Sequence, residues 1–407
     1  MDQESLRITD STKGVPVHKA TVLALHNRYV VPGGEEVAFA SETALLEARG
    51  HRVVKYVVQN EPFSGWRKGT VGVGALWSEG SYRAVQRLID ESEPTVVHCH
   101  NTFPLISPSV YYAARRRGVP VVQTIHNYRL VCVNGLLFRD GRPCGDCVGK
   151  RVAWPGVRNA CYHNSTLQST SVAGMVALHR MVGTWSRQVS AFVAPTFLSR
   201  SMLLKVGAPS DKVHIVPNFV PTDPGVGRHG SDYILFVGRL SHEKGIETFV
   251  QALRALGGTV RARIVGGGPL EAWVMQEIRS MDNVSYHGSV SKEQVAELMK
   301  DATALIVPSL CFEVFPTVIV EAFATGLPVI ASGHGAMAEI LEDGQTGVLF
   351  PAGDADALAH AIRSVMEDSG LRLGLARAGR ANFDARYDAG HHYESLVRVY
   401  EAALASA

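Results

Sequence analysis

The sequence contains no low-complexity tract and no apolar run that approaches about 18 residues, the length at which a membrane-spanning helix becomes a candidate. No transmembrane helix is therefore predicted. The N-terminal stretch MDQESLRITDSTKG is polar and lacks the apolar segment of a secretory signal. We expect a cytoplasmic protein, with peripheral attachment to the inner face of a membrane as an open alternative.

Charged residues make up only 19% of the chain, and the net charge is +2. The two halves nevertheless differ. Residues 1–225 hold 25 Lys and Arg against 16 Asp and Glu, a net of +9, whereas residues 226–407 hold 15 against 22, a net of −7. The cationic first half suggests an anionic partner, either a membrane surface or a phosphorylated acceptor, and an ordinary solvated surface is the alternative. We expect no nucleic-acid partner.

At 407 residues the chain exceeds the size of one hydrophobic core, so two domains are predicted. Short apolar runs alternate with stretches of helical spacing (35–49, 79–91 and 107–117 in the first half), which indicates an α/β fold with parallel sheets covered on both faces. We predict two Rossmann-like, doubly wound domains that face each other across a cleft. The expected strands are 20–26, 52–58, 95–100, 119–126, 191–195, 233–239, 261–267, 304–309 and 328–332.

The run PSLCFEVFPTVIVEAFATG carries the strongest functional signal. It follows the apolar run ALIVP, so Glu313 is expected in a loop after a strand. Pro316 suits the first turn of a helix that ends at Gly326 and carries Glu321. Both carboxylates would face the crevice beyond the strand, where open α/β sheets bind ligands and where carboxylates suit paired sugar hydroxyls. Two solvated surface carboxylates are the alternative.

The run FVGRLSHEKGIETF places Gly238, Arg239 and Lys244 between a strand and the next helix. Two cations beside a helix N-terminus form an anion site suited to a diphosphate. A helix-capping Lys and a surface Arg are the alternative. After the next strand, the glycines of IVGGGPLEAW would let the backbone approach a ligand closely and form a wall of the nucleotide pocket; they are Gly266, Gly267 and Gly268.

In the first half, Gly33 and Gly34 precede a helix that Glu35 and Glu36 open, and free N–H groups there would face phosphates or an acceptor. The strand run VPVVQTIHNY ends in His126, which is placed to hydrogen-bond a sugar in the cleft and to steady positive charge there. His98 and His100 end the preceding strand. For these two, a core or surface position is favoured over a place on the acceptor side.

Four of the six cysteines fall within 30 residues: Cys132, Cys144, Cys147 and Cys161. A C-x2-C knuckle with two flanking cysteines predicts a structural tetrathiolate zinc site in a cysteine-rich insert over 130–165. Disulfides are the rival, against which a reducing compartment argues, and free thiols are the third possibility. Neither Cys99 nor Cys311 is assigned a role.

The E-x7-E spacing with F-P between, together with GRL-x3-KG, resembles the signature of retaining glycosyltransferase family 4, whose members have the GT-B fold. This resemblance covers most of the chain and is strongest over 233–351, although Val314 stands where many relatives carry Gly or Pro. It implies a first domain over 1–217 and a second over 218–388, with the Pro- and Gly-rich stretch 217–231 as hinge. A last helix, about 389–407, would cross back onto the first domain.

The resemblance also implies a function and roles. We expect a retaining glycosyltransferase (a hexosyltransferase) that moves a sugar from a UDP- or GDP-linked donor to a hydroxyl of a glycan, glycolipid or small glycoside, without a catalytic metal. Glu313 would touch the donor sugar and Glu321 the ribose, and His126 would line the donor pocket. Val290 would contact the base, and Val314, Phe315 and Pro316 belong to the same motif. A sugar-nucleotide epimerase or hydrolase and a non-catalytic sugar-nucleotide binder are the alternatives.

Overall fold

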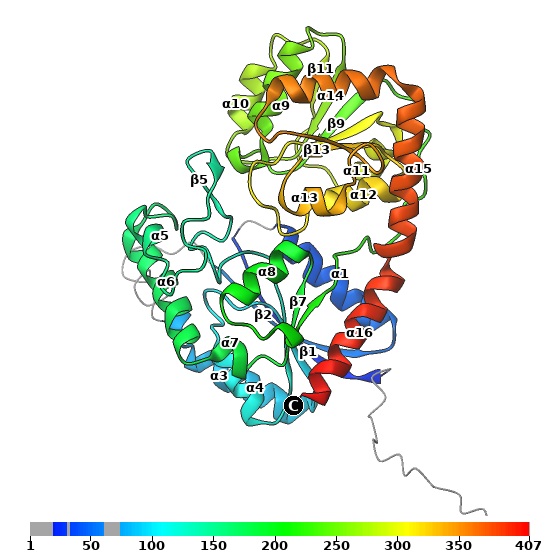
Figure 1. The fold of residues 1–407 in the computed structure, drawn as a ribbon. Coiled ribbons are helices and arrows are strands. Elements are labelled where there is room, and N and C mark those ends of the chain that lie inside the picture. Colours follow the sequence, from blue (N-terminus) through cyan, green and yellow to red (C-terminus); the bar gives the residue numbers. More distant parts are fainter. Residues whose placement is uncertain (1–18, 31–32, 61–73, 407) are drawn as a thin grey trace, which may run out of the picture.

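The computed structural model describes residues 19–30, 33–60 and 74–406, which form two six-stranded parallel sheets (Figure 1). The predicted α/β class with two parallel sheets is confirmed. The first sheet has the order β2-β1-β3-β4-β7-β8 and the second the order β11-β10-β9-β12-β13-β14. Their strands are β1 (Thr21–Arg28), β2 (Arg52–Gln59), β3 (Val96–Asn101), β4 (Val121–Thr124), β7 (Ala191–Ala194), β8 (Val213–Ile215), β9 (Tyr233–Val237), β10 (Arg261–Val265), β11 (Val284–Tyr286), β12 (Ala304–Val307), β13 (Val329–Ser332) and β14 (Val348–Phe350).

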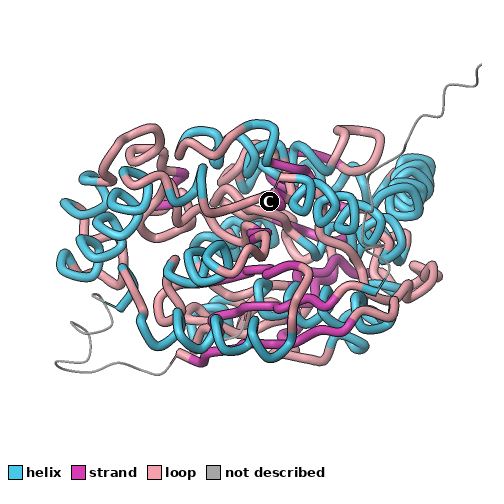
Figure 2. The backbone as a smooth tube through the Cα atoms, turned by 90° about the horizontal axis from the view of Figure 1, so that it is seen from below, coloured by secondary structure: helices cyan, strands magenta, loops and turns pink. Residues whose placement is uncertain are grey.

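Helices cover both faces of each sheet, and Figure 2 shows the strands lying between them. Side chains that alternate along β1 pack into different cores: Leu23 and Leu25 face one, and Val22 faces the other. The same division occurs on β9, where Ile234 and Leu235 enter separate cores. Burial on both faces explains why the strands read as continuous apolar runs in the sequence.

The helices of the first half are α1 (Gly34–Ala48), α3 (Glu79–Ser92), α4 (Ser109–Arg116), α5 (Trp154–Arg158), α6 (Thr166–Met181), α7 (Thr184–Arg187) and α8 (Phe197–Lys205). Those that follow are α9 (Ile246–Ala255), α10 (Glu271–Glu277), α11 (Lys292–Asp301), α12 (Thr317–Thr325), α13 (Gly335–Ile340), α14 (Ala355–Glu367), α15 (Ser369–Arg386) and α16 (Ala389–Ala405). None of these described helices combines the length and the apolar composition that a membrane span requires.

The second sheet has the strand order of dinucleotide-binding Rossmann folds, in which the chain winds outward from β9 in one direction and resumes beside β9 at β12. The loops after β9 and β12 therefore leave the sheet side by side. Ligands of open α/β sheets bind at this switch point, beyond the carboxyl ends of the strands. The sheet thus brings the GRL loop and the E-x7-E loop together.

The final helix, α16, packs on the first sheet although it follows the second in the chain (Figure 1). Leu396 and Tyr400 are fully buried in the core that contains Val22 of β1 and Val122 of β4. Asp388 caps the helix by accepting a hydrogen bond from the backbone N–H of His391 at 2.8 Å. The C-terminal segment therefore ties the two sheets together.

The segment 130–165 lies outside the first sheet and carries little regular structure. It contains the hairpin of β5 (Phe138–Arg139) and β6 (Arg142–Pro143), whose turn places Asp140 and Gly141 at positive φ. The short helix α5 follows. This segment borders the cleft between the sheets through Asn134, Gly135 and Leu136.

Candidate active site

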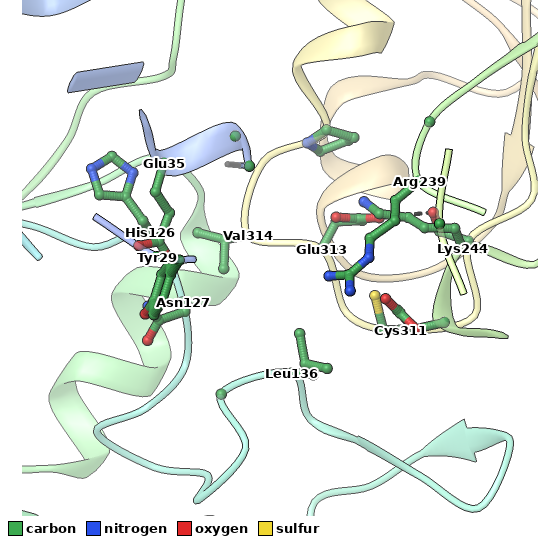
Figure 3. A pocket seen from close by; sticks show the side chains of 18 of the residues that line it. Tyr29, Glu35, His126, Asn127, Leu136, Arg239, Lys244, Cys311, Glu313 and Val314 are labelled. Carbon is green, nitrogen blue, oxygen red and sulfur yellow. Dashed lines mark hydrogen bonds and ion pairs between the residues drawn. The ribbon is translucent and has the colours of Figure 1, made fainter. Parts of the chain in front are cut away.

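A cleft with a volume of about 1440 Å³ lies between the two sheets, and residues from both line it (Figure 3). In Figure 3, Arg239, Lys244 and Glu313 form one wall, and Tyr29, Glu35, His126 and Asn127 form the opposite wall. Every residue predicted for the donor site borders this cleft: Gly33, Gly34, His126, Gly238, Arg239, Lys244, Gly266, Gly267, Gly268, Val290, Glu313, Val314, Phe315, Pro316 and Glu321.

The loop after β9 supplies two cations. Arg239 is exposed, and no described residue forms a hydrogen bond or ion pair with it. Lys244 ends a short 3₁₀ turn and precedes Gly245, which has φ +69. A Cβ at Gly245 would lie 1.8 Å from the carbonyl oxygen of Pro308, so only glycine lets this loop pack against the end of β12.

The glycine loop after β10 packs on the same segment. Gly266 has φ +130, and a Cβ there would lie 1.9 Å from the carbonyl oxygen of Gly238. The backbone N–H of Leu240 donates to the carbonyl oxygen of Gly267 at 3.0 Å. These glycines therefore let two loops of the protein pack closely on each other. The sequence analysis predicted a close approach to a ligand only.

Glu313 and Lys244 form an ion pair, with Lys244 Nζ 2.6 Å from Glu313 Oε1. The hydroxyl of Ser309 donates to the same oxygen at 2.8 Å. Burial is the largest effect and would raise the pKa of Glu313, but the charge and hydrogen bond of Lys244, with smaller effects of Ser309 and His334, together lower the pKa. Glu313 is therefore an anion, and Arg239 is the unpaired cation of this wall.

Glu321 lies on α12, which begins after Pro316 and ends at Gly326 with φ +72, as the sequence pattern predicted. Its carboxylate borders the cleft, and burial raises its pKa, with Lys292 opposing that shift. Ser289 and Val290, which follow β11, line the cleft on the same side. These residues complete a pocket at the switch point of the second sheet.

His126 lies two residues beyond β4, which ends at Thr124, and so the predicted strand 119–126 was too long at this end. Its Nε2 is 3.0 Å from Nδ1 of His100. Burial and the nearby His100 lower the pKa of His126 well below its usual value, which makes the imidazole neutral. A neutral imidazole has one donor and one acceptor nitrogen, and because Nε2 already contacts His100, Nδ1 is the nitrogen left for a ligand.

His98 and His100 do not line this cleft; both are buried, with 1% and 3% of their surface exposed. The core position that the sequence favoured is therefore correct, and a place on the acceptor side is wrong. Both side chains point from β3 toward α1, because alternate residues of a strand face the same side of a sheet.

Gly33 and Gly34 border the cleft, but the N–H of Gly33 is not free. It donates to Glu36 Oε2 at 2.7 Å, and the N–H of Tyr29 donates to Glu36 Oε1 at 3.0 Å. Glu36 therefore holds the loop that connects β1 to α1. The N–H of Gly33 is therefore not one of the free groups predicted to face a phosphate or an acceptor.

Glu35 and Asn127, which lie beside the predicted residues, also line this wall of the cleft and hydrogen-bond to each other. Glu35 Oε1 accepts a hydrogen bond from Asn127 Nδ2 at 2.7 Å, and Oε2 has no hydrogen-bond partner in the described structure. Burial raises the pKa of Glu35 to about 7, against the opposing effects of Asn127 and Arg129. The sequence signals were their places directly after Gly34 and His126, but the hydrogen bond between them required the fold.

The raised pKa of Glu35 predicts a pH-dependent effect on stability. Because ionisation costs more in the folded protein, Glu35 lowers the free energy of unfolding increasingly as the pH rises from about 4.5 to about 7. The variant Glu35→Gln should therefore be more stable than the parent by roughly 2 kcal/mol above pH 7, after allowance for partial exposure. Urea unfolding at pH 5 and pH 8 measures the difference. An equal difference at both pH values, or the same result for exposed Glu47→Gln on α1, would contradict this account.

Direct contacts join the two walls. The hydroxyl of Tyr128 donates to the carbonyl oxygen of Glu313 at 3.0 Å, and the hydroxyl of Thr196 donates to that of Val314 at 3.3 Å. Glu339 on α13 accepts hydrogen bonds at 2.7 Å from the first two backbone N–H groups of α8. A carboxylate at a helix N-terminus is favoured by the helix dipole. The loop that carries Glu313 is thus fixed by both domains.

The four clustered cysteines are neighbours in the fold. Burial is the main cause that raises the pKa of Cys132 and Cys161, and together with the nearby sulfurs, Cys144 included, it raises the pKa of Cys147 to about 11. Backbone groups of Asn134, Gly135 and Leu137 hydrogen-bond to the sulfur of Cys132 and oppose this effect. Within the described chain, however, Glu42, His98 and His100 are the only group that brings three ligand atoms within 4.8 Å of one another.

Comparison with known proteins agrees with this geometry. Residues 32–224 match the family model "Glycosyltransferase Family 4", and residues 225–382 match "Glycosyl transferases group 1". A D-inositol 3-phosphate glycosyltransferase of Xylanimonas cellulosilytica is 31% identical over 348 residues, 79% of this chain and 75% of that protein. A phosphatidyl-myo-inositol mannosyltransferase of Mycobacterium leprae is 31% identical over 61% of this chain and 67% of its own.

Among solved structures, the Anabaena protein HepE in complex with UDP and glucose superposes with a TM-score of 0.66 at 19% identity. The match covers 93% of this chain and 98% of that protein, so it establishes a shared fold across both domains. The two family models that match, and the 31% identity to the Xylanimonas enzyme over 75% of its length, identify the family. The chain belongs to glycosyltransferase family 4.

Proposed function

We propose that this protein is a retaining glycosyltransferase that uses a UDP- or GDP-linked sugar and a hydroxyl acceptor on a glycan, glycolipid or small glycoside. The observation that carries the proposal is the convergence of Arg239, Lys244, Glu313 and Glu321 at the switch point of the second sheet, in a cleft that the first domain closes. The Anabaena relative that contains UDP and glucose supports a nucleotide-sugar donor.

Each group has a chemical task in this proposal. Arg239 binds the diphosphate, because its guanidinium faces the cleft unpaired and matches phosphate oxygens bidentately. Lys244 adds a second positive charge and fixes the carboxylate of Glu313, whose Oε2 remains for the hydroxyls of the donor sugar. Glu321 accepts hydrogen bonds from the ribose hydroxyls.

The chemical step would need no protein nucleophile. The bond between the anomeric carbon and the donor phosphate breaks as the acceptor oxygen attacks from the same face, and the departing phosphate takes the acceptor's proton. Arg239 and Lys244 stabilise the charge that grows on the diphosphate, and no catalytic metal is required for that task. Neutral His126, whose Nε2 is taken by His100, hydrogen-bonds the transferred sugar through Nδ1 from the opposite wall.

This mechanism predicts the stereochemistry. The product should keep the anomeric configuration of the donor, and the rate should be unchanged by a strong magnesium chelator, because two side chains replace the metal. Proton NMR of the anomeric signal during turnover, with and without chelator, measures both. An inverted product, or activity lost to chelation and restored by magnesium, would contradict the mechanism. Rapid loss of the donor without any acceptor would instead identify an epimerase or hydrolase, and donor binding without turnover a non-catalytic binder.

We also propose that Cys132, Cys144, Cys147 and Cys161 bind one structural zinc ion. Two cysteines come from the knuckle after β6, and the others flank it from either side. Backbone hydrogen bonds to the sulfurs of Cys132 and Cys147, and the guanidinium of Arg139 beside Cys161, oppose the burial that raises the pKa of these thiols, and a bound cation would complete that stabilisation. The ion would organise the segment that borders the cleft at Leu136.

The cationic first domain supports a proposed peripheral contact with an anionic membrane or a phosphorylated acceptor. Between residues 147 and 210 the sequence has seven Lys and Arg and no Asp or Glu. Helices α5 and α6 in this stretch expose Trp154, Leu167 and Met181, with 53%, 67% and 78% of their surface accessible. Exposed apolar side chains amid basic ones suit an interfacial surface.

Vesicle flotation tests the membrane contact. The protein should float with vesicles that contain anionic lipid and not with neutral vesicles, and Met181→Glu should reduce the floated fraction by roughly half or more. Met275→Glu, which alters an exposed methionine on α10 of the second domain, serves as the matched control. Equal flotation with neutral and anionic vesicles, or none with either, would contradict the contact with an anionic membrane. The phosphorylated acceptor would then remain as the explanation of the positive charge of the first domain.

A further inference from the structure

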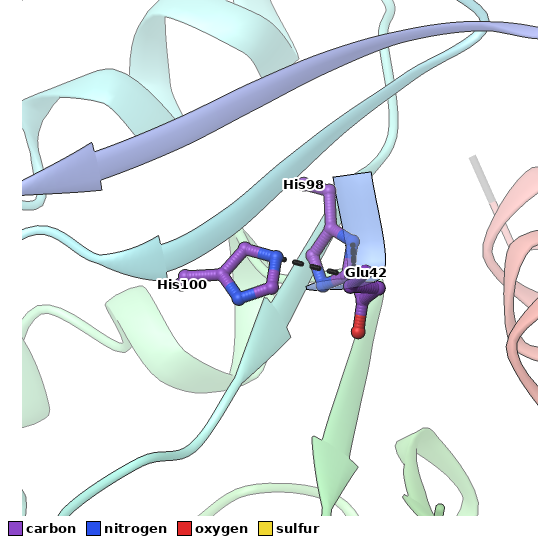
Figure 4. A group of neighbouring side chains, drawn as sticks. All are labelled: Glu42, His98 and His100. Carbon is purple, nitrogen blue, oxygen red and sulfur yellow. Dashed lines mark ion pairs between the residues drawn. The ribbon is translucent and has the colours of Figure 1, made fainter. Parts of the chain in front are cut away.

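Behind His126, three side chains converge in the interior of the first domain (Figure 4). Glu42 comes from α1, and His98 and His100 come from β3. Their exposed fractions are 4%, 1% and 3%. Oε1 of Glu42 lies 3.1 Å from Nδ1 of His98 and 3.2 Å from Nε2 of His100.

These contacts are short enough for hydrogen bonds, but their angles do not have hydrogen-bond geometry. Within the described structure, Oε1 of Glu42 and Nε2 of His100 have no hydrogen-bond partner, although each is buried. Buried polar atoms without a partner are rare, because desolvation costs about 1–3 kcal/mol each. The 3.2 Å between Oε1 of Glu42 and Nε2 of His100 is close to the distance between two ligand atoms of a tetrahedral zinc ion, which is roughly 3.3 Å for bonds of about 2.0–2.1 Å.

The outward-facing atoms of the same three side chains are all held. Nε2 of His98 is 2.7 Å from Oγ1 of Thr124, and Nδ1 of His100 is 3.0 Å from Nε2 of His126. Oε2 of Glu42 is 3.3 Å from Nε2 of His392 on α16. Histidines that ligate a metal donate their other N–H to an acceptor in this way, which fixes the tautomer and the ring orientation.

Charge gives a second reason for a cation at this place. A fully buried carboxylate requires a positive partner, and the groups that contact Oε1 are the imidazoles of His98 and His100. Nδ1 of His98 also shares a hydrogen bond of 2.8 Å with the hydroxyl of Tyr400, which a metal ion on Nδ1 would displace. Either one imidazole is protonated or a metal ion supplies the charge. Two imidazoles and a carboxylate form a ligand set for a divalent first-row transition metal.

We propose that Glu42 Oε1, His98 Nδ1 and His100 Nε2 bind one divalent transition-metal ion, with zinc the best match to the spacing. The site is structural and takes no part in the reaction. It would fix Nδ1–H of His100 as the donor to Nε2 of His126, so that His126 presents Nδ1–H to the cleft. It would also join α1, β3 and, through His392, α16. This inference is independent of the proposed transferase function.

Metal content of the full-length protein tests the site. The parent and two variants are incubated with zinc, desalted and measured by elemental analysis. We expect Glu42→Gln to carry about one equivalent less zinc than the parent, and the matched variant Glu47→Gln, exposed on the same helix, to carry as much as the parent. Equal zinc in all three proteins would overturn the proposal and leave a protonated imidazole as the partner of Glu42.

Cobalt substitution separates this site from the cysteines and does not depend on whether Glu42→Gln folds. In the variant Cys144→Ser, which breaks the thiolate set, bound Co²⁺ should show visible bands of a nitrogen- and oxygen-ligated ion without a thiolate charge-transfer band. Zinc should abolish these bands by displacement. A spectrum identical to that of free Co²⁺ would overturn the proposal.

Discussion

Replacing Arg239 with alanine is expected to lower kcat/KM for the nucleotide sugar about 10²–10³-fold, which corresponds to about 2.7–4 kcal/mol of transition-state stabilisation. The physical reason is that charge on the diphosphate grows as the glycosidic bond breaks, and Arg239 is the cation of the donor wall without a described protein partner. Affinity for the nucleoside diphosphate should fall as well, by about 1.5–3 kcal/mol. Steady-state kinetics and isothermal titration with UDP and GDP measure both.

Two further variants, Arg261→Ala and Lys244→Ala, show whether the effect is specific to Arg239. Arg261→Ala removes an exposed guanidinium at the start of β10, the end of the sheet remote from the cleft, and should leave both constants unchanged. Lys244→Ala alone does not separate these effects, because it also leaves the half-buried carboxylate of Glu313 without its cation. If Arg239→Ala matches Arg261→Ala in rate and affinity, Arg239 does not bind the donor diphosphate.

Cys144→Ser is expected to remove about one zinc equivalent per chain and to disorder the segment 130–165. Structural zinc contributes about 10–16 kcal/mol of binding free energy in zinc-finger peptides, and a segment with so little regular structure depends on such a source. Hydrogen exchange should therefore accelerate across 130–165, while UDP still raises the melting temperature through the second domain. Catalysis should suffer through the acceptor side of the cleft, which this segment borders at Leu136.

Cys99→Ala is the matched control, since Cys99 is a buried thiol of β3 outside the cluster, and its replacement should leave the zinc content unchanged. Two results would contradict the zinc proposal. One is metal-free protein, as isolated, in which all four clustered thiols titrate freely. The other is bound iron with visible absorption, which would indicate an iron–sulfur cluster instead.

The local pattern of the sequence determined the strands and the loops that follow them. Strands that are buried on both faces consist of continuous apolar runs, and nine of the strands could be predicted from such runs in the sequence. Because parallel strands end at one edge, polar residues directly after those runs had to gather there. That is why the loops with Arg239 and Glu313, 74 positions apart, border one cleft. Shorter strands such as β8 and β11, of three residues, gave no such signal.

Which polar groups pair depends on long-range packing. A run of residues shows that Lys244 and Glu313 reach the same edge, but the 2.6 Å contact between them depends on how two loops pack around Gly245. Glu42 shows the limit most clearly. It is one carboxylate in a helical stretch, and its partners His98, His100 and His392 lie 56, 58 and 350 positions away. Local periodicity places a side chain on a face of its own element, whereas its contacts depend on the neighbours that long-range packing brings to that face.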